Sequence, residues 1–529
     1  MADLPLHEAC VGLLRHWGDP LFAPSAVYFV NLGHANQLFS WLVLIVSYAL
    51  PIAWATKAVV ALSLIGLPLA AAHFAAHVAA PRWTALLVAP LGFGWLFFWG
   101  LIQNIVGIVA LLALLPLIDR FASKPTGRGT LAVCGAMLLL HFAHEAMELV
   151  ACAAILCCSI DASYSLKSAV TRTLPLVFCA GIVYLANRYA WHFASARHWA
   201  TSPFVLYPLD HKLFSVPGVL YGGFEPYVRD LMFLLGGCPL VMFLIGRIRR
   251  VGAPVNSLVN RVRSWRFEVL ALLLLGIYFA GPANIRSTTL VYHRFLPPAW
   301  AILSVSLAAG LRNVMRPLPV LLCAAMPVAS LLIVWPTFVD SHRMYSDLDS
   351  LLPHMARGTA VLAINFGPDP PHRLWSPSVA GGYVVAEHGG RSVHDYTQSP
   401  VSIVAQRPGK EWLEPLLRLE GHLGDIRPAW DFTRFRYLIL ATTKPSIALT
   451  VSMAVRDYAR LISSKGDWYL FESKLPLVAI DANDAPLPTP HPKTLRFLMK
   501  QVAKDLEAGD ESHIDSILPD DDAVRALIP

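Results

Sequence analysis

Four ionisable side chains lie together in an apolar region, in the stretch "HFAHEAMELV" at residues 141–150. They are His141, His144, Glu145 and Glu148, and on a continuous helix their spacing would place them on one side. The pattern is close to the zinc-hydrolase motif HExxH, but Glu148 stands where that motif has its second histidine. Three interpretations stay open: a metalloprotease centre, a polar turn that caps two short helices, and a substrate-binding group, since ionisable residues in a membrane are often functional.

The beginning of the chain, "DLPLHEACVGLLRHWGD", offers carboxylates beside an imidazole. Asp3 and His7 are four residues apart and share a face of a helix, and Glu8 follows His7 directly. A carboxylate with a nearby imidazole can act as a general base on a hydroxyl group. The alternative is an ordinary amphipathic surface helix whose N-terminus is capped by the aspartate.

Two long loops, 191–229 and 282–296, collect further polar and aromatic residues. These include Asp210, His211, Lys212, Tyr221, Glu225, Tyr227, Arg229, Arg286, Tyr292, His293 and Arg294. A guanidinium group binds phosphate through two parallel hydrogen bonds. Arg294 stands directly before an apolar segment and is therefore a candidate for holding a lipid-linked phosphate. The alternative is an arginine that extends toward lipid headgroups.

The composition indicates a membrane domain followed by a soluble domain. Of the 529 residues, 56% are hydrophobic and 15% are charged, and the mean hydropathy is +0.53. Residues 1–335 contain 22 Lys and Arg against 11 Asp and Glu, whereas residues 336–529 contain 20 against 24. The basic balance therefore belongs to the membrane part. The sequence has no basic patch with interleaved aromatic residues, so it does not indicate nucleic acid as a partner.

Apolar segments predict about ten membrane crossings. They are residues 57–79, 83–99, 101–119, 129–144, 146–160, 169–190, 230–246, 267–281, 297–311 and 317–335. The arginine-rich loop 247–266 marks the cytoplasmic side, so the loops 191–229 and 282–296 and everything after residue 335 are expected outside. Residues 37–56 contain Pro51 and lack a flanking basic loop, which favours a re-entrant or interfacial helix pair on the outer side; the alternative is an eleventh span, which would place the N-terminus on the other side of the membrane.

Four regions follow from these patterns. Residues 1–36 are expected to be an outer-face amphipathic segment, 37–335 a multi-span membrane domain, 336–480 an extracytoplasmic α/β domain, and 481–529 a linker with a short helix and an acidic tail. In the third region "TAVLAINF", "FRYLILAT" and "DWYLFES" predict buried strands, with a helix at 447–463. The expected fold class is an α-helical polytopic protein of the cell (inner) membrane with a C-terminal soluble α/β domain.

Several of these stretches together resemble the GT-C superfamily of polytopic membrane glycosyltransferases. "DLPLHEA" at 3–9 is similar to the family's outer loop with an essential aspartate, and "LGHANQLF" at 32–39 occupies the place of its following apolar segment. A histidine between two short helices, as at His144, also occurs in the family. "YHRFLPP" at 292–298 looks like the arginine-bearing start of a late span. The family's first span is not found before Asp3.

The resemblance implies an inverting transfer of a sugar from a polyprenyl-phosphate donor to a glycan, lipid or protein acceptor. Asp3 and Glu8 would be the catalytic carboxylates, and Arg294, with Lys212, would hold the donor phosphate. The substrate-binding residues would be His7, His34, His144, Glu145, Lys212, Glu225, His293 and Arg294. No metal ligand is assigned, and the need for a divalent metal stays open. The alternative is a transporter or flippase of a lipid-linked saccharide, which would use the same cleft without forming a bond.

Overall fold

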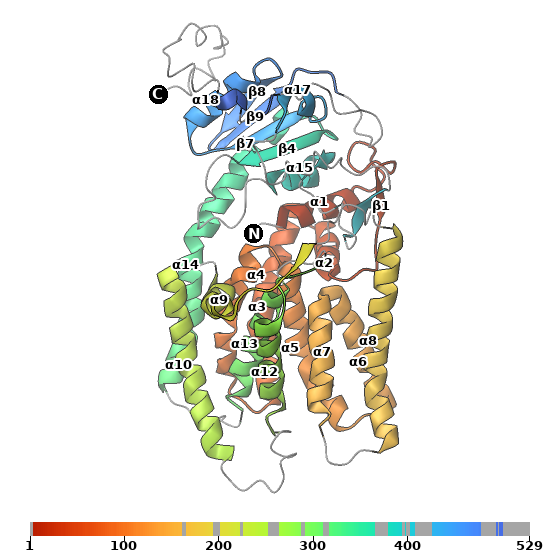
Figure 1. Cartoon of the computed structure of the whole chain (residues 1–529), viewed down its shortest axis with the longest axis vertical. Helices are drawn as coiled ribbons and strands as arrows, with labels where there is room; N and C mark the ends of the chain where they lie inside the picture. Colours follow the sequence, from red (N-terminus) through yellow and green to blue (C-terminus); the bar gives the residue numbers. More distant parts are fainter. Residues whose placement is uncertain are drawn as a thin grey trace.

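The chain forms an elongated bundle of helices with a β-sheet at one end (Figure 1). The computed structural model describes residues 4–160, 165–193, 202–222, 226–251, 264–286, 291–309, 317–365, 379–393, 397, 402–407, 426–477, 493–495 and 497–500. The described part is mostly helical. We name the end of the bundle that meets the sheet the sheet end, and the other end the opposite end.

Five helices are long and apolar enough to cross a membrane, judged by length and composition. They are α3 (Ile52–His77), α5 (Ile102–Ser123), α8 (Leu166–Phe193), α10 (Pro226–Val251) and α14 (Pro317–Asp349). Large apolar side chains on them face outward, among them Leu62, Leu69 and Leu332. Such exposed apolar surface is stable against lipid and costly in water. The protein is therefore a membrane protein.

The ten expected crossings are not confirmed. Four of the expected segments form helices of 11 to 17 residues, namely α6 (Gly127–Ala143), α7 (Glu145–Cys158), α12 (Arg266–Ala280) and α13 (Leu296–Ser306). At about 1.5 Å per residue these helices are shorter than the roughly 30 Å of a hydrocarbon core. The segment 83–99 consists of two 3₁₀ turns, η1 (Arg82–Leu87) and η2 (Ala89–Phe93), and the short helix α4 (Trp95–Phe98).

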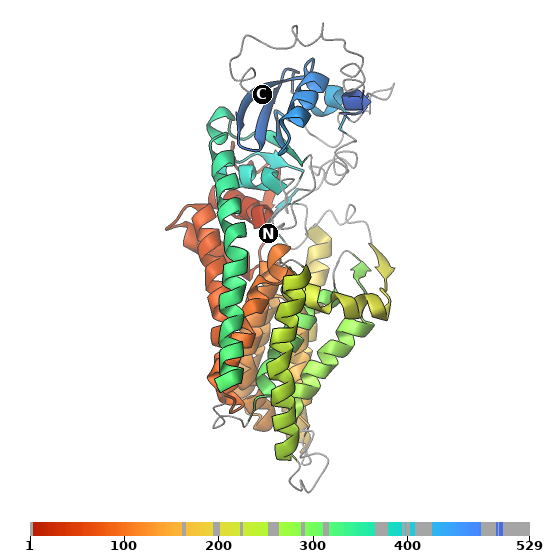
Figure 2. The ribbon, with the colours of Figure 1, turned by 90° about the vertical axis from the view of Figure 1, so that its left-hand side faces the viewer.

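The expected boundary between the membrane domain and the soluble domain, at residue 336, falls inside α14. This helix continues to Asp349 and carries the chain from the bundle up to the sheet (Figures 1 and 2). Pro327 and Pro336 both lie within this helix. Residues 37–56 form the short helix α2 (Leu38–Ser47), a turn, and the beginning of α3.

The N-terminal helix α1 (Leu4–Arg15) is buried between the bundle and the C-terminal region, which corrects the expected amphipathic surface segment. It packs closely on α15 (Ala380–His388): a Cβ atom on Gly12 would lie 2.6 Å from the carbonyl oxygen of Ala386. Strand β1 (Tyr28–Val30) also pairs with β6 (Val404–Gln406) in antiparallel fashion. The beginning of the chain and the C-terminal region therefore form one packed body.

The C-terminal region contains a five-stranded sheet in the order β5-β4-β7-β9-β8. The strands are β4 (Ala360–Asn365), β5 (Arg391–Ser392), β7 (Tyr437–Ala441), β8 (Ala459–Lys465) and β9 (Trp468–Ser473). β5, β4 and β7 are parallel, and β9 and β8 join them in antiparallel fashion. The mixed sheet with α15, α17 (Pro428–Asp431) and α18 (Pro445–Val455) agrees with the expected α/β character. The helix expected at 447–463 ends earlier in the structure: α18 stops at Val455, and strand β8 begins at Ala459. Residues 481–492 and 501–529 lie outside the described residues.

Ion pairs hold helices together at the opposite end. Arg266 donates to Asp119 through Nε (2.6 Å to Oδ1) and Nη2 (2.9 Å to Oδ2), and His77 Nε2 lies 2.8 Å from the same carboxylate. These contacts join α3, α5 and α12. Arg247 of α10 likewise lies 3.3 Å from Glu268 of α12. All five of these side chains lie near the ends of their helices, close to the loops that connect the helices.

Candidate functional site

The stretch that drew attention in the sequence, residues 141–150, is a break between two helices. His144 has an extended backbone, with φ −169° and ψ 122°, so α6 ends at Ala143 and α7 begins at Glu145. The break confirms the interpretation of two short helices. His141 Nδ1 lies 2.9 Å from Oε2 of Glu148, and both side chains are buried. His141 Nδ1 and Glu148 Oε2 therefore pair across the break, whereas the buried His141 Nε2 and Glu148 Oε1 find no hydrogen-bond partner among the described residues.

His144 faces another part of the chain. Its Nε2 lies 3.1 Å from Nη1 of Arg294, and its Nδ1 lies 3.2 Å from the backbone nitrogen of Ala146. Both neighbours are hydrogen-bond donors, and a neutral imidazole accepts through one nitrogen at a time. Only one of these two contacts can therefore be a hydrogen bond to the neutral ring. Burial and the charge of Arg294 lower the pKa of His144, which keeps the ring neutral beside the guanidinium of Arg294 at the sheet end of the bundle.

Arg294 belongs to a group of basic and aromatic side chains that we name the basic–aromatic cluster. Its members are Trp95, Tyr207, His211, Lys212, Tyr292, His293 and Arg294, from α4, the segment before α9 (Leu209–Tyr221), α9 itself and η3 (Tyr292–Arg294). Trp95 stacks on His293 with ring centroids 4.6 Å apart, and Tyr207 lies 4.7 Å from His211 and 6.1 Å from Tyr292. Burial, together with nearby His211, Lys212 and Arg294, lowers the pKa of His293 to about 4.

Lys212 has a structural task within this cluster. Its Nζ donates to the carbonyl oxygens of Phe279 (2.9 Å) and Gly281 (2.5 Å) at the end of α12, and it lies 4.7 Å from the ring centroid of Tyr292. Lysine is favourable at a helix C-terminus because the last carbonyls lack partners within the helix. The side chain is almost fully buried. Lys212 therefore contributes positive charge to the cluster while anchoring α9 to α12.

Helix α5 connects the cluster to the N-terminal helix. The imidazole of His7 contacts the amide of Gln103, with Nε2 atoms 2.5 Å apart. One turn further along α5, Gly107 lies against His144, so that a Cβ atom on this glycine would be 2.7 Å from the Cβ of His144. Residues 103 and 107 share a helical face. The same face of α5 therefore brings His7 close to the junction of α6 and α7.

His34 also reaches this junction. Its Nε2 lies 2.8 Å from Oδ1 of Asn31, and the next residues along the loop cover the end of α6. The backbone nitrogen of Asn36 donates to the carbonyl of His141, and the side chain of Asn36 accepts from the backbone nitrogen of Glu145. The side chain of Glu145 is partly buried. Of the expected site residues, His144 and Arg294 are in direct contact, and His7 and His34 lie on segments that meet the same junction of α6 and α7.

Glu8 belongs to a different environment from that of its neighbour His7. Adjacent residues point to different sides of a helix, and the buried Glu8 carboxyl lies beside Thr56 and near Asp349 and Glu387. Burial raises the pKa of Glu8 to about 8, against its hydrogen bond with Thr56. Tyr383 donates a hydrogen bond to Asp349 in the same group. The structure does not bring Glu8 into the basic–aromatic cluster.

Asp3 and Glu225, two further expected site residues, lie outside the described residues. Sequence reasoning missed Trp95, Gln103 and Tyr207. Trp95 and Gln103 lie in apolar segments that were interpreted only as membrane crossings. The polar side chain of Gln103 at the start of its segment was the one signal in the sequence that could have indicated a contact there. Within the described ranges no group of three or more His, Cys, Asp or Glu side chains is arranged to hold a metal ion.

Comparisons with known proteins found no matching family model, curated protein or solved structure. The functional argument therefore depends on the contacts described above.

Proposed function

We propose that the protein is a membrane glycosyltransferase that takes its sugar from a polyprenyl-phosphate donor. The observation that supports this proposal most strongly is the basic–aromatic cluster, with Arg294 held against His144 at the sheet end of the bundle. Positive charge at a membrane boundary favours an anionic group carried by a lipid. Aromatic rings beside that charge suit the apolar face of a sugar and the first carbons of a lipid chain.

The proposal gives different tasks to the members of the cluster. Arg294 can present guanidinium N–H groups to phosphate oxygens, and the His144 ring lies beside it, with Nε2 3.1 Å from Nη1. Lys212 adds charge from a fixed position beneath Tyr292. Trp95 and His293 form a flat, stacked surface next to the arginine. Binding a phosphate at this point would hold the bond between phosphate and sugar beside that surface.

In the proposed reaction an acceptor hydroxyl attacks the anomeric carbon of the sugar. The bond from that carbon to the phosphate oxygen breaks, and polyprenyl phosphate leaves with the bonding electrons. The hydroxyl proton goes to a carboxylate general base, for which Asp3 remains the candidate from the sequence. Glu8 is less suited to this task, because a pKa of about 8 keeps it protonated at neutral pH. Arg294 stabilises the charge that develops on the phosphate.

The proposal is tested in membranes that contain the full chain and cell-envelope acceptors. A donor with a radiolabelled sugar is added, and label in the acceptor fraction is measured for the wild type and for Arg294→Gln, His144→Ala and Asp3→Asn. We expect Arg294→Gln to lower transfer at least about a hundredfold, in line with the loss of a charged group that stabilises the reacting centre. Arg456→Gln, at an exposed turn of the C-terminal region, is the control and is expected to keep wild-type activity.

Two outcomes would contradict the proposal. One is equal transfer by Arg294→Gln and the wild type. The other is movement of intact donor between the two leaflets of proteoliposomes with no transfer of label to any acceptor. The second result would instead support the transporter or flippase alternative.

A further inference from the structure

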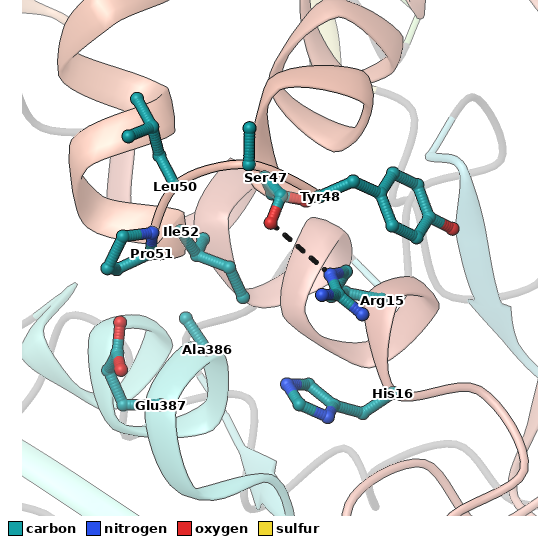
Figure 3. A pocket seen from close by; sticks show the side chains of 10 residues that line it. Arg15, His16, Ser47, Tyr48, Leu50, Pro51, Ile52, Ala386 and Glu387 are labelled. Carbon is teal, nitrogen blue, oxygen red and sulfur yellow. Dashed lines mark hydrogen bonds between the residues drawn. The ribbon is translucent and has the colours of Figure 1, made fainter.

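A pocket with an accessible volume of about 350 Å³ lies at the sheet end, away from the basic–aromatic cluster. It is bounded by the end of α1, the turn between α2 and α3, and α15, and its lining includes Arg15, His16, Ser47, Tyr48, Ile52 and Glu387 (Figure 3). Small-molecule sites commonly have volumes of roughly 300–1,000 Å³. The pocket is thus large enough for a polar headgroup.

Arg15 supplies a positive charge on one side of this pocket, and Glu387, whose pKa is raised by burial and by Asp349, supplies a carboxyl group on the other. Figure 3 shows Arg15 and His16 on one side and Glu387 on the other. Arg15 donates through Nε to the carbonyl of Ser47 (3.4 Å) and lies 4.6 Å above the ring of Tyr48. These contacts hold the guanidinium while leaving its two Nη groups for a ligand. In the part of the chain that the structure describes, neither Arg15 nor Glu387 forms a salt bridge.

The rim of the pocket has the character of a membrane interface. Tyr48 and Leu50 line the pocket and are 67% and 42% exposed, and Trp54 follows on α3 with 59% exposed. Lys57 lies 4.9 Å from the ring centroid of Trp54. Tyrosine, tryptophan and lysine concentrate at the boundary between lipid headgroups and acyl chains. Further along α3, Leu62 and Leu69 also face outward.

From these observations we propose that the pocket binds a lipid headgroup that carries both a phosphate and a primary ammonium. The phosphate would lie against Arg15 and His16, and the ammonium would donate to Glu387. The acyl chains would leave past Leu50 and Trp54 and run along the exposed face of α3. A headgroup with a phosphate alone would leave Glu387 facing an anion, and a quaternary ammonium cannot donate a hydrogen bond to a carboxylate. This inference does not depend on the proposed glycosyltransferase activity.

The test uses the purified full chain in detergent, titrated calorimetrically with dioctanoyl phosphatidylethanolamine, phosphatidylcholine and phosphatidylglycerol. We expect the wild type to bind the ethanolamine lipid most tightly, by about tenfold over the other two, as one charge-assisted hydrogen bond implies. Equal binding of the three lipids would overturn the proposal, and this comparison needs no variant to fold. Binding of free phosphoethanolamine as tight as that of the lipid would contradict a bilayer lipid as the ligand.

Two substitutions separate the two charges. Glu387→Gln is expected to weaken the binding of phosphatidylethanolamine about tenfold and to leave the binding of phosphatidylglycerol unchanged or stronger. Arg15→Gln is expected to weaken the binding of both of these lipids about tenfold. Arg456→Gln is the control and is expected to match the wild type. Glu387→Gln and Arg15→Gln proteins that bind all three lipids as the wild type does would exclude this pocket as the site.

Discussion

Replacing Glu8 by glutamine is expected to stabilise the protein at alkaline pH and to have little effect at acidic pH. The Glu8 carboxyl is only 6% exposed, and burial raises its pKa from 4.5 to about 8, with Glu387 and Asp349 adding to the rise. The folded state therefore holds the Glu8 proton more firmly than the unfolded state does. The resulting loss of stability is absent below pH 4.5, grows between pH 4.5 and 8, and is complete above pH 8.

The size of the effect follows from these two pKa values. Each pH unit between them lowers the free energy of unfolding by about 1.4 kcal/mol, which gives at most about 5 kcal/mol above pH 8. The penalty is about 0.7 kcal/mol at pH 5, so the advantage of Glu8→Gln over the wild type should grow by about 4 kcal/mol between pH 5 and pH 8.5. Glutamine can keep the hydrogen bond, because the Thr56 hydroxyl donates to the carbonyl of Ile52 (2.9 Å) and can accept from an amide.

The assay is unfolding of the detergent-solubilised protein, followed by tryptophan fluorescence at pH 5 and pH 8.5. The quantity of interest is the difference between the variant and the wild type, because titrating groups that do not interact with Glu8 contribute equally to both. Asp457→Asn removes an exposed carboxyl and is the control, with a difference that stays the same at both pH values. A Glu8→Gln protein that is destabilised equally at pH 5 and pH 8.5 would refute the reasoning.

The remaining predictions concern packing and ion pairing. Asp119→Asn should destabilise the protein by about 3–5 kcal/mol, because it leaves the part-buried Arg266 without its closest carboxylate. The double variant with Arg266→Gln should recover part of that lost stability. Asp230→Asn, at an exposed ion pair, is the comparison and should cost only about 0–1 kcal/mol. Gly12→Ala should cost about 1–3 kcal/mol and increase proteolysis of the C-terminal region, because its Cβ would meet the backbone of Ala386. Gly135→Ala is the control: its Cβ would meet open space, so this substitution should be neutral or stabilising. Equal changes in the unfolding temperature for Gly12→Ala and Gly135→Ala would contradict the packing of α1 on α15.

The sequence was informative where a local signal controls the structure. The polar residues at 141–148 predicted two short helices, and the extended backbone of His144 confirms them. Histidine and arginine residues in separate loops predicted a common site, and the 3.1 Å contact between His144 and Arg294 brings two of them together. Strands β4, β7 and β9 followed from short runs of buried apolar residues, whereas β5 and β8 were not predicted.

Other features depend on contacts between distant segments, which hydropathy does not report. A run of apolar residues reads the same whether it crosses a membrane or, like α13, forms a short helix within the bundle. α1 appeared amphipathic because its polar residues were assumed to face water, whereas Glu8 is covered by packing against α15. α14 continues through Pro336 to Asp349 and connects the bundle to the sheet, which the expected boundary at residue 336 did not anticipate.

The most direct test of the central claim follows the bond between sugar and phosphate in the donor. Proteoliposomes with the full chain and an acceptor extract receive polyprenyl-phosphate sugar, and free polyprenyl phosphate is measured over time by thin-layer chromatography. We predict that polyprenyl phosphate accumulates with the wild type and with Arg456→Gln, and that Arg294→Gln abolishes this accumulation. Donor that stays intact with the wild type, or that is cleaved equally with Arg294→Gln, would contradict the assignment of the basic–aromatic cluster as the donor site.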